Sequence, residues 1–281
     1  MRKYHQKPTT HLGKMSINVL NLDRSLAFYE QVIGYQLLEK TKRQAILTVD
    51  GKNPTLILKS PEGVIPKKRL TTGLYHFAIL LPKRNDLANF LRHLLTLNIP
   101  FGASDHAVSE AIYLDDPDGN GIEVYCDRPD AHWERVTDGI HMTTDRLDGD
   151  NLLQEADAKW TILPENTVMG HIHLHVAHLA DTEKFYSQGL DFDLMTRYPG
   201  ALFMSSGGYH HHLGLNIWNG EGAPAPAEGS VGLNWFTLVI ENEAKRERLK
   251  QNLDTIGATV KEHDGNYMTK DPSGNVIRLV I

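Results

Sequence analysis

Two side chains of the types that can bind metal ions lie near the two ends of residues 73–127. The segment opens with GLYHFAILLP, which carries His76, and closes with EAIYLDDPDGNGIEVYCD, which carries Glu123. Both ends are rich in β-branched and aromatic residues and are bounded by Gly, Pro and Asp turn signals, a pattern typical of strands. An imidazole and a carboxylate on neighbouring strands would supply two of the three ligands of a metal site. The rest of the chain must then provide the third.

The strands that carry these residues belong to a pattern that occurs four times, with a period of about 50–60 residues. Unit one spans residues 12–62, unit two 73–127, unit three begins at 170 and unit four at 232, and each is a strand, a helix and three strands. A four-stranded unit leaves one sheet face uncovered, so we expect the units to pair. Outside the units, we expect a short helix over residues 150–158 and a loop over 221–230.

Composition bounds the classes of function. The chain has 281 residues, of which 41% are hydrophobic and 23% charged, and its net charge is -6. These values favour a globular protein and give no reason to expect a nucleic-acid or membrane partner. The N-terminal residues lack the apolar core of a signal peptide, and no apolar run approaches a membrane span. The single cysteine, Cys126, fits a reducing compartment, so we expect a cytoplasmic protein.

Several motifs together resemble one known superfamily. They are the βαβββ repeat, the FY pair in LAFYEQVIGY (26–35) and EKFYSQGLDF (183–192), and the closing motif DPDGNGIE. This combination resembles the vicinal oxygen chelate superfamily of glyoxalases, bleomycin-resistance proteins and type I extradiol dioxygenases, and four units resemble the catechol 2,3-dioxygenase branch. The resemblance implies an α+β fold whose four modules pair into two curled mixed-sheet barrels. Modules one and two would occupy residues 10–127, a connecting segment 128–169, and modules three and four 170–281.

The resemblance also implies positions for the metal ligands. In the superfamily a histidine opens the first strand of a unit, and a glutamate in the last strand follows D-P-x-G-N. Applied to this chain, the pattern gives His76, Glu123 and His171. The corresponding positions of units one and four carry side chains that are not ordinary ligands: Lys14, Trp235 and Arg278. Two histidines and one carboxylate leave open positions on non-haem Fe(II), and Mn(II) is the alternative ion.

This ligand set makes a geometric prediction. The more familiar dioxygenases take their ligands from units three and four, whereas here they come from units two and three. Unit two must therefore pair with unit three, and unit one with unit four. Alternatives stay open for the third ligand, because His173 and His175 share a strand face with His171 and because His11 precedes the unit-one position. Taken alone, His76 could be a core histidine, and Glu123 could face solvent.

Ring cleavage also needs groups that hold and move protons, and His and Tyr suit this task. The resemblance assigns this role to three residues. Tyr113, ten residues before Glu123, would bond a catechol oxygen, and His106 in DHAVSEAIY would bond a substrate hydroxyl. In the triplet of GYHHHLGL, His211 would handle the proton that passes to oxygen, while His210 and His212 would point away.

The expected function is an Fe(II)-dependent extradiol dioxygenase that uses O2 to cleave a small aromatic diol. One alternative is a glyoxalase-like isomerase or lyase with Zn, Ni or Mn and a fourth protein ligand. Another is a metal-free binding protein with a bleomycin-resistance-like groove. The sequence leaves open which catechol or hydroquinone is used, and whether the chains form a homo-oligomer.

Overall fold

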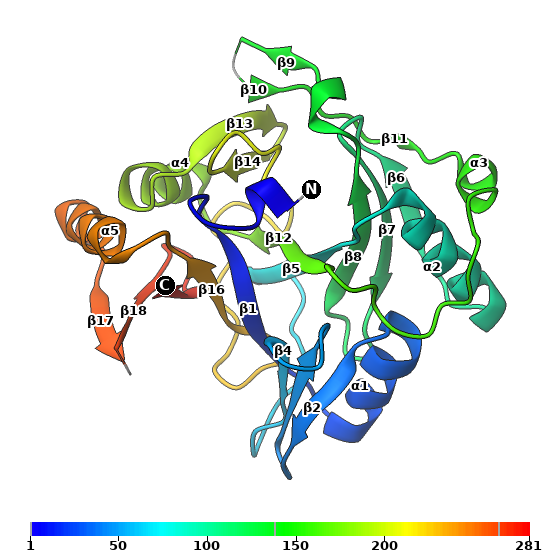
Figure 1. Ribbon diagram of the computed structural model, residues 1–281. Coiled ribbons are helices and arrows are strands. Elements are labelled where there is room, and N and C mark those ends of the chain that lie inside the picture. Colours follow the sequence, from blue (N-terminus) through cyan, green and yellow to red (C-terminus); the bar gives the residue numbers. More distant parts are fainter. Residues whose placement is uncertain (1, 138, 264) are drawn as a thin grey trace.

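The computed structural model describes residues 2–137, 139–263 and 265–281. Two large mixed sheets dominate it, and they lie side by side with helices outside them (Figure 1). A two-stranded ribbon stands apart at one edge and consists of β9 (Arg135–Val136) and β10 (Gly139–Ile140). The expected α+β architecture of four βαβββ modules is confirmed.

The nine-stranded sheet contains units two and three. In spatial order, its strands are β11 (Asp145–Arg146), β6 (Gly102–Asp105), β7 (Ser109–Asp115), β8 (Gly121–Asp127), β5 (Gly73–Leu80), β12 (Val168–His175), β15 (Leu213–Asn216), β14 (Ala201–Ser205) and β13 (Asp193–Tyr198). The eight-stranded sheet contains units one and four. Its order is β17 (Val260–His263), β18 (Asn266–Lys270), β19 (Val276–Val280), β16 (Gly232–Val239), β1 (His11–Asn18), β4 (Pro54–Lys59), β3 (Gln44–Thr48) and β2 (Gln36–Lys40).

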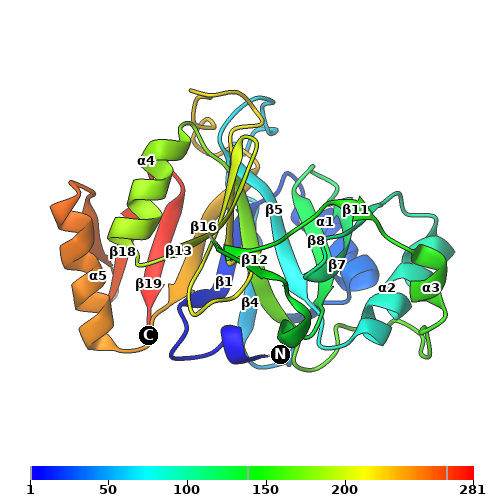
Figure 2. The ribbon, with the colours of Figure 1, turned by 90° about the horizontal axis from the view of Figure 1, so that it is seen from above.

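The pairing of units agrees with the prediction from the ligand positions. The first strands of units two and three, β5 and β12, pair antiparallel at the centre of the nine-stranded sheet. The first strands of units one and four, β1 and β16, do the same in the other sheet. In Figure 2 these four strands lie in the middle of the molecule, with α4 and α5 on one flank and α1, α2 and α3 on the other. The predicted pairing is therefore confirmed.

The helices are short and lie on the outside of the sheets. They are α1 (Leu22–Phe28), α2 (Arg84–Leu97), α3 (Gly149–Leu153), α4 (Leu179–Lys184) and α5 (Glu243–Thr255), with 3-10 turns η1 (Arg2–Tyr4) and η3 (Asp130–His132) and π turns η2 (Tyr29–Ile33) and η4 (Phe185–Gly189). Helix α3 is shorter than the expected helix over 150–158. After Leu153 the chain leaves the helix, and the carbonyls of Ala156 and Ala158 accept hydrogen bonds from Arg92 of α2.

The FY and D-P-x-G-N motifs meet each other in space. The Tyr29 hydroxyl donates to the Asp116 carboxylate at 3.0 Å, and Tyr186 donates to Asp271 at the same distance. Each Asp also caps its own turn by accepting from the backbone N–H of the Asn four residues later. These motifs therefore join the helix of one unit to the closing turn of the next, and their role is structural.

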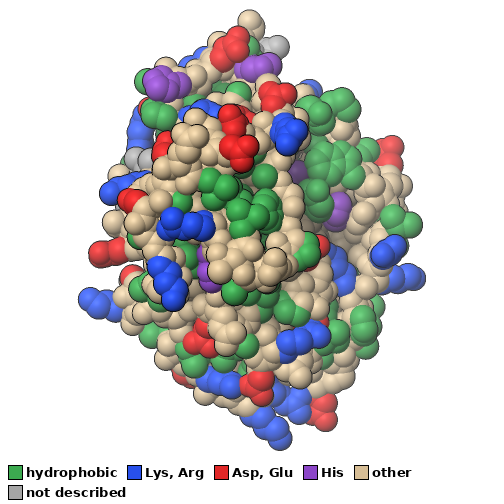
Figure 3. All heavy atoms as spheres, turned by 90° about the vertical axis from the view of Figure 1, so that its right-hand side faces the viewer, with side chains coloured by type: hydrophobic (Ala, Val, Ile, Leu, Met, Phe, Trp, Pro, Cys, Tyr) green, Lys and Arg blue, Asp and Glu red, His purple; other side chains and the backbone are tan. Residues whose placement is uncertain are grey.

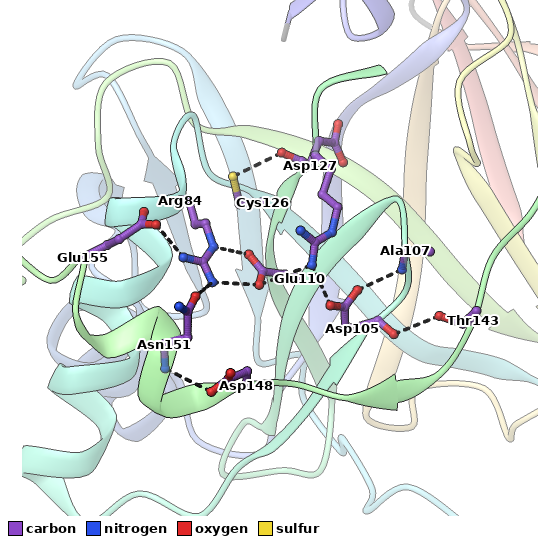
Figure 4. A network of polar contacts seen from close by, with 11 residues as sticks. Arg84, Asp105, Ala107, Glu110, Cys126, Asp127, Thr143, Asp148, Asn151 and Glu155 are labelled. Carbon is purple, nitrogen blue, oxygen red and sulfur yellow. Dashed lines mark hydrogen bonds and ion pairs between the residues drawn. The ribbon is translucent and has the colours of Figure 1, made fainter. Parts of the chain in front are cut away.

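A polar network docks the connecting segment onto unit two. Arg84 at the start of α2 makes a bidentate ion pair with Glu110 of β7 and also contacts Asn151 and Glu155 of the connecting segment (Figure 4). A bidentate guanidinium–carboxylate pair has a fixed geometry. The network thus fixes the path of the connecting segment, which also supplies Thr143 beside the site described below.

The outer face over α2 and α3 carries interspersed acidic and basic side chains together with hydrophobic ones (Figure 3). Within the described ranges, no helix has both the length and the apolar character needed to span a membrane.

Candidate metal centre

His76, Glu123 and His171 come from three adjacent strands, β5, β8 and β12. Ala78 of β5 is paired with Glu123 on one side and with His171 on the other. His76 precedes Ala78 by two residues, and strand alternation therefore places it on the same face. All three ligand candidates are buried, with exposed fractions of 7%, 3% and 1% in the order His76, Glu123 and His171.

The ligand atoms of these residues converge. Nε2 of His76 and Nε2 of His171 each lie 3.0 Å from Oε2 of Glu123, and all three atoms lie within 4.8 Å of one another. The His171 nitrogen is hydrogen-bonded to the carboxylate, whereas the equally close His76 nitrogen has no hydrogen-bond partner in the described part of the chain. Buried polar atoms normally have partners. A metal ion at the point of convergence would satisfy His76, so the donor set fits such an ion.

The electrostatics of the cluster suit metal binding as well. Burial by itself raises the pKa of Glu123, but the neighbouring His171 and His76 outweigh it, and the pKa lies well below its usual range. Burial lowers the pKa of His171, although Glu123 opposes this shift. An ionised carboxylate therefore faces a neutral His171, and these are the protonation states in which the two groups bind metals.

The eight-stranded sheet has a position that corresponds to the cluster but carries other side chains. Arg278 of β19 is paired with Thr237 of β16, as Glu123 is paired with Ala78. The Arg278 guanidinium lies 4.1 Å from the ring centroid of Trp235, a cation–π contact. A stacked cation and indole thus occupy the corresponding place, and neither is an ordinary metal ligand.

His11 does not join the cluster. It lies on β1 of the eight-stranded sheet, and its Nδ1 donates to the Thr9 carbonyl at 2.8 Å. Lys14, on the same strand, is exposed. Among the described residues, the one group of three or more His, Cys, Asp or Glu side chains with metal-binding geometry is the cluster of His76, Glu123 and His171.

A cavity of about 260 Å³ opens beside the cluster. Its lining is formed by Tyr75, His76, Ser104, His106, Tyr113, Glu123, Met142, Thr143, Thr144, His171, His173, Thr196, Tyr198, Phe203, His211 and Trp218. Three of its aromatic side chains are large and partly exposed, at 40% for Tyr75, 49% for Tyr198 and 47% for Trp218. The cavity therefore has an aromatic mouth and a histidine-rich floor, a shape that suits a flat aromatic molecule with polar groups on one edge.

Tyr113 and His106 line the cavity as a hydrogen-bonded pair. The Thr143 carbonyl can only accept, so Nδ1 of His106 donates to it at 2.6 Å. In the neutral ring, Nε2 is then the acceptor for the Tyr113 hydroxyl, also at 2.6 Å. Burial and the nearby Glu123 raise the pKa of Tyr113 well above its usual value, which keeps the phenol protonated. The connecting segment, through Thr143, thus orients both residues.

His211 lines the cavity, and its two neighbours point elsewhere, as expected. Its ring centroid lies 4.2 Å from that of His171. The His210 Nε2 bonds to Asp127, and the His212 Nε2 donates to the Tyr4 carbonyl at 2.9 Å. All three rings are buried, and burial lowers the pKa of His211 well below its usual value.

His173 and His175 share a face with His171 but are held by Asn216 of β15. The Trp218 backbone N–H donates to the Asn216 side-chain oxygen, which identifies that atom as the acceptor for His175 at 2.7 Å. The Asn216 amide nitrogen consequently donates to Nε2 of His173 at 2.9 Å. Of the two, His173 lines the cavity, and its Nε2 is already engaged.

Two glycines allow this close packing. A Cβ atom at Gly214 would lie 2.7 Å from the His173 ring, and one at Gly121 would lie 2.2 Å from the Tyr75 carbonyl oxygen. Such contacts are too short, so both strands need glycine where they pass the histidines.

A family model described as the glyoxalase/bleomycin resistance protein/dioxygenase superfamily matches residues 11–124 and 168–279. The chain belongs to this superfamily. A curated relative is catechol-2,3-dioxygenase of Bacillus subtilis (strain 168), which is 47% identical over 278 residues, 97% of this chain and 98% of that protein. Biphenyl-2,3-diol 1,2-dioxygenase 3 of Rhodococcus globerulus is 29% identical over 165 residues, 56% of this chain and 86% of that protein.

Solved structures of other proteins share the fold. Glyoxalase I from Zea mays aligns with a TM-score of 0.58 at 17% identity, over 96% of this chain and 92% of that one. The cppA protein from Streptococcus pneumoniae TIGR4 aligns with a TM-score of 0.56 at 10% identity, over 97% and 99%. At these identities the likeness concerns the fold alone.

Several residues of the site were not predicted from the ligand and motif positions of the superfamily. Tyr75, Phe203 and Trp218 form much of the cavity wall, and Asn216 holds two histidines. A local signal existed for Tyr75, because it directly precedes His76. No such signal existed for Asn216, whose role depends on the pairing of β12 with β15.

Proposed function

We propose that this chain is an Fe(II)-dependent extradiol dioxygenase that cleaves the ring of an uncharged catechol with O2. The observation that carries the proposal is the two-histidine, one-carboxylate cluster on the floor of an aromatic cavity. The 47% identity with a catechol-2,3-dioxygenase over nearly the whole chain supports it.

His76, Glu123 and His171 would hold the ion. Three protein ligands leave coordination positions free, and when bound the ion would supply positions that hold the diol and O2 next to each other. Iron is the ion that this ligand set suits for oxygen chemistry, with manganese as the alternative.

The chain's own residues bind the diol and move its protons. Tyr75, Phe203 and Trp218 offer aromatic surface to the ring and exclude water from it. The Tyr113 hydroxyl, oriented by His106, is placed to hydrogen-bond one diol oxygen. His211 offers Nε2, which has no hydrogen bond in the described part of the chain, to take up a proton and return it later.

A glyoxalase-like isomerase would need a fourth protein ligand, often a second carboxylate. The metal-binding group among the described residues has three members, and Glu123 is the one acidic residue that lines the cavity. This arrangement favours the three-ligand centre.

The test is anaerobic loading with Fe(II), followed by catechol and air. We expect O2 uptake in proportion to a yellow, ring-opened product, and neither with Zn²⁺ in place of iron. An enzyme that binds Zn²⁺ tightly and shows no O2 uptake with any catechol after loading with Fe(II) or Mn(II) would refute the proposal.

A further inference from the structure

A buried chain of hydrogen bonds runs from the cavity into the protein interior behind His211. Nδ1 of His211 lies 2.8 Å from Nδ1 of His210, and Nε2 of His210 lies 2.9 Å from Oδ1 of Asp127. The same oxygen accepts from the Tyr209 hydroxyl at 3.1 Å, and this hydroxyl is 2.8 Å from that of Tyr125. The exposed fraction of each of these side chains is below 10%.

The Asp127 carboxylate and the single ring proton of a neutral His210 together fix the direction of each hydrogen bond in this network. A carboxylate accepts only, so Nε2 of His210 carries a proton and donates it to Asp127. In the neutral ring, Nδ1 of His210 is then an acceptor, and Nδ1 of His211 must carry the proton between the two rings. Nε2 of His211 is left unprotonated. On the other side, Tyr125 donates to Tyr209, which donates to Asp127.

Packing leaves the two rings little freedom to reverse this arrangement. The ring centroids of Tyr209 and His210 are 3.9 Å apart, and Trp133 packs on His210 at 5.1 Å. Rotation of the His210 ring would break its bond to Asp127 and leave a buried carboxylate short of one donor, which is costly.

We propose that Asp127 and His210 are positioning residues that fix the tautomer of His211, so that its Nε2 presents a lone pair to the cavity. This inference rests on the proposed function. During the reaction the O–H bond of one diol hydroxyl breaks and its proton forms a bond to Nε2 of His211. The resulting imidazolium keeps its Nδ1–H directed at His210. The arrangement resembles a Ser-His-Asp triad in its logic, with a second imidazole between carboxylate and base.

The decisive variant is Asp127→Leu. An asparagine would not serve, because its side-chain oxygen could replace Oδ1 and keep both donors, His210 and Tyr209. Leucine is of similar size but accepts no hydrogen bond, so the buried Nε2–H of His210 would lose its partner, which is costly. His210 then carries its proton on Nδ1 and donates to His211, so that Nε2 of His211 carries the proton. The tautomer is read by NMR of ¹⁵N-histidine-labelled protein loaded with Zn²⁺, with the His211 signals assigned from His211→Gln. We expect an Nδ1-protonated His211 in the parent chain and an Nε2-protonated His211 in Asp127→Leu.

The matched control is His212→Gln, which removes the neighbouring buried ring, whose partners are Tyr4 and Ser206 rather than Asp127. We expect it to leave the His211 tautomer unchanged. In the iron-loaded enzyme, kcat should fall by about 10²-fold in Asp127→Leu at unchanged metal content and by less than about 3-fold in the control, because general-base steps contribute on this scale.

The inference fails if the parent chain carries its His211 proton on Nε2, and this result does not depend on whether Asp127→Leu folds. It also fails if Asp127→Leu switches the tautomer while kcat stays the same. If the parent tautomer is as expected but no catechol is cleaved, the proposed function fails and the tautomer assignment stands, so the two failures can be told apart.

Discussion

A catechol that carries a carboxylate on its ring is expected to be a poor substrate, because the cavity lining offers no cationic side chain to pair with that charge. The lining comprises sixteen residues of the described chain, and none of them is Lys or Arg. Glu123 is its one acidic member. Lys67, on the loop before β5, donates its amine to the Leu74 carbonyl at 2.9 Å and does not line the cavity.

The magnitude follows from desolvation. An ion that is buried without a partner costs several kcal/mol in real proteins. The partly exposed Tyr75, Tyr198 and Trp218 at the mouth would let a substituent keep some of its water, so we take about 3 kcal/mol, at the low end of that range. Since 1.36 kcal/mol corresponds to a factor of ten, kcat/KM should fall by about 10²-fold.

The assay compares 3,4-dihydroxybenzoate with its methyl ester, which has the same ring and nearly the same shape but no charge. O2 uptake is measured with each substrate on the iron-loaded enzyme. The variant Tyr198→Lys, which places a cation at the mouth, should recover part of the loss for the acid alone, whereas Tyr198→Met should not. Equal kcat/KM for acid and ester in the parent enzyme would refute the reasoning.

Three further predictions concern the metal, acid stability and the motif contacts. Glu123→Gln should lower the affinity for Fe(II) by at least about 10²-fold, because it removes the charged ligand, and equilibrium dialysis measures this change. The control His11→Gln should retain the ion. An equal loss of affinity in both variants would contradict the ligand assignment. Burial lowers the pKa of His5 from 6.5 to about 4. Between these values the unfolded chain binds a proton that the folded chain does not, so the free energy of unfolding should fall as the pH falls, by about 1.4 kcal/mol per pH unit from this group. Urea denaturation at several pH values should show this slope in the metal-free protein, and His5→Gln should flatten it. Tyr29→Phe and Tyr186→Phe should each cost about 1.5 kcal/mol, since each Asp keeps its other donors, and should lower Tm by about 2–4 °C without changing kcat. A variant that left Tm unchanged would show that its Tyr–Asp contact does not stabilise the fold.

Repeats and motif positions were sufficient to predict the modules and their pairing. The absence of ordinary ligands at Lys14, Trp235 and Arg278 left units two and three as partners, and the sheet order agrees. The helix over 150–158 was predicted too long, because local propensity could not anticipate that Arg92 would bind the carbonyls after Leu153. Local signals failed where a contact from another element decided the outcome.

The sequence by itself determined which residues of each strand share a face, because side chains alternate with a period of two and motifs mark where strands begin and end. Together with the resemblance to the superfamily, this pattern placed His76, Glu123 and His171 among the ligand candidates and predicted that His210 and His212 would point away from His211. Only the tertiary structure decided what lies behind these residues. Asp127 reaches His210 across 83 positions of chain, and Asn216 reaches His173 across 43. Such hydrogen bonds depend on strand register and ring orientation, which are settled when the sheets pack together and not by any local pattern.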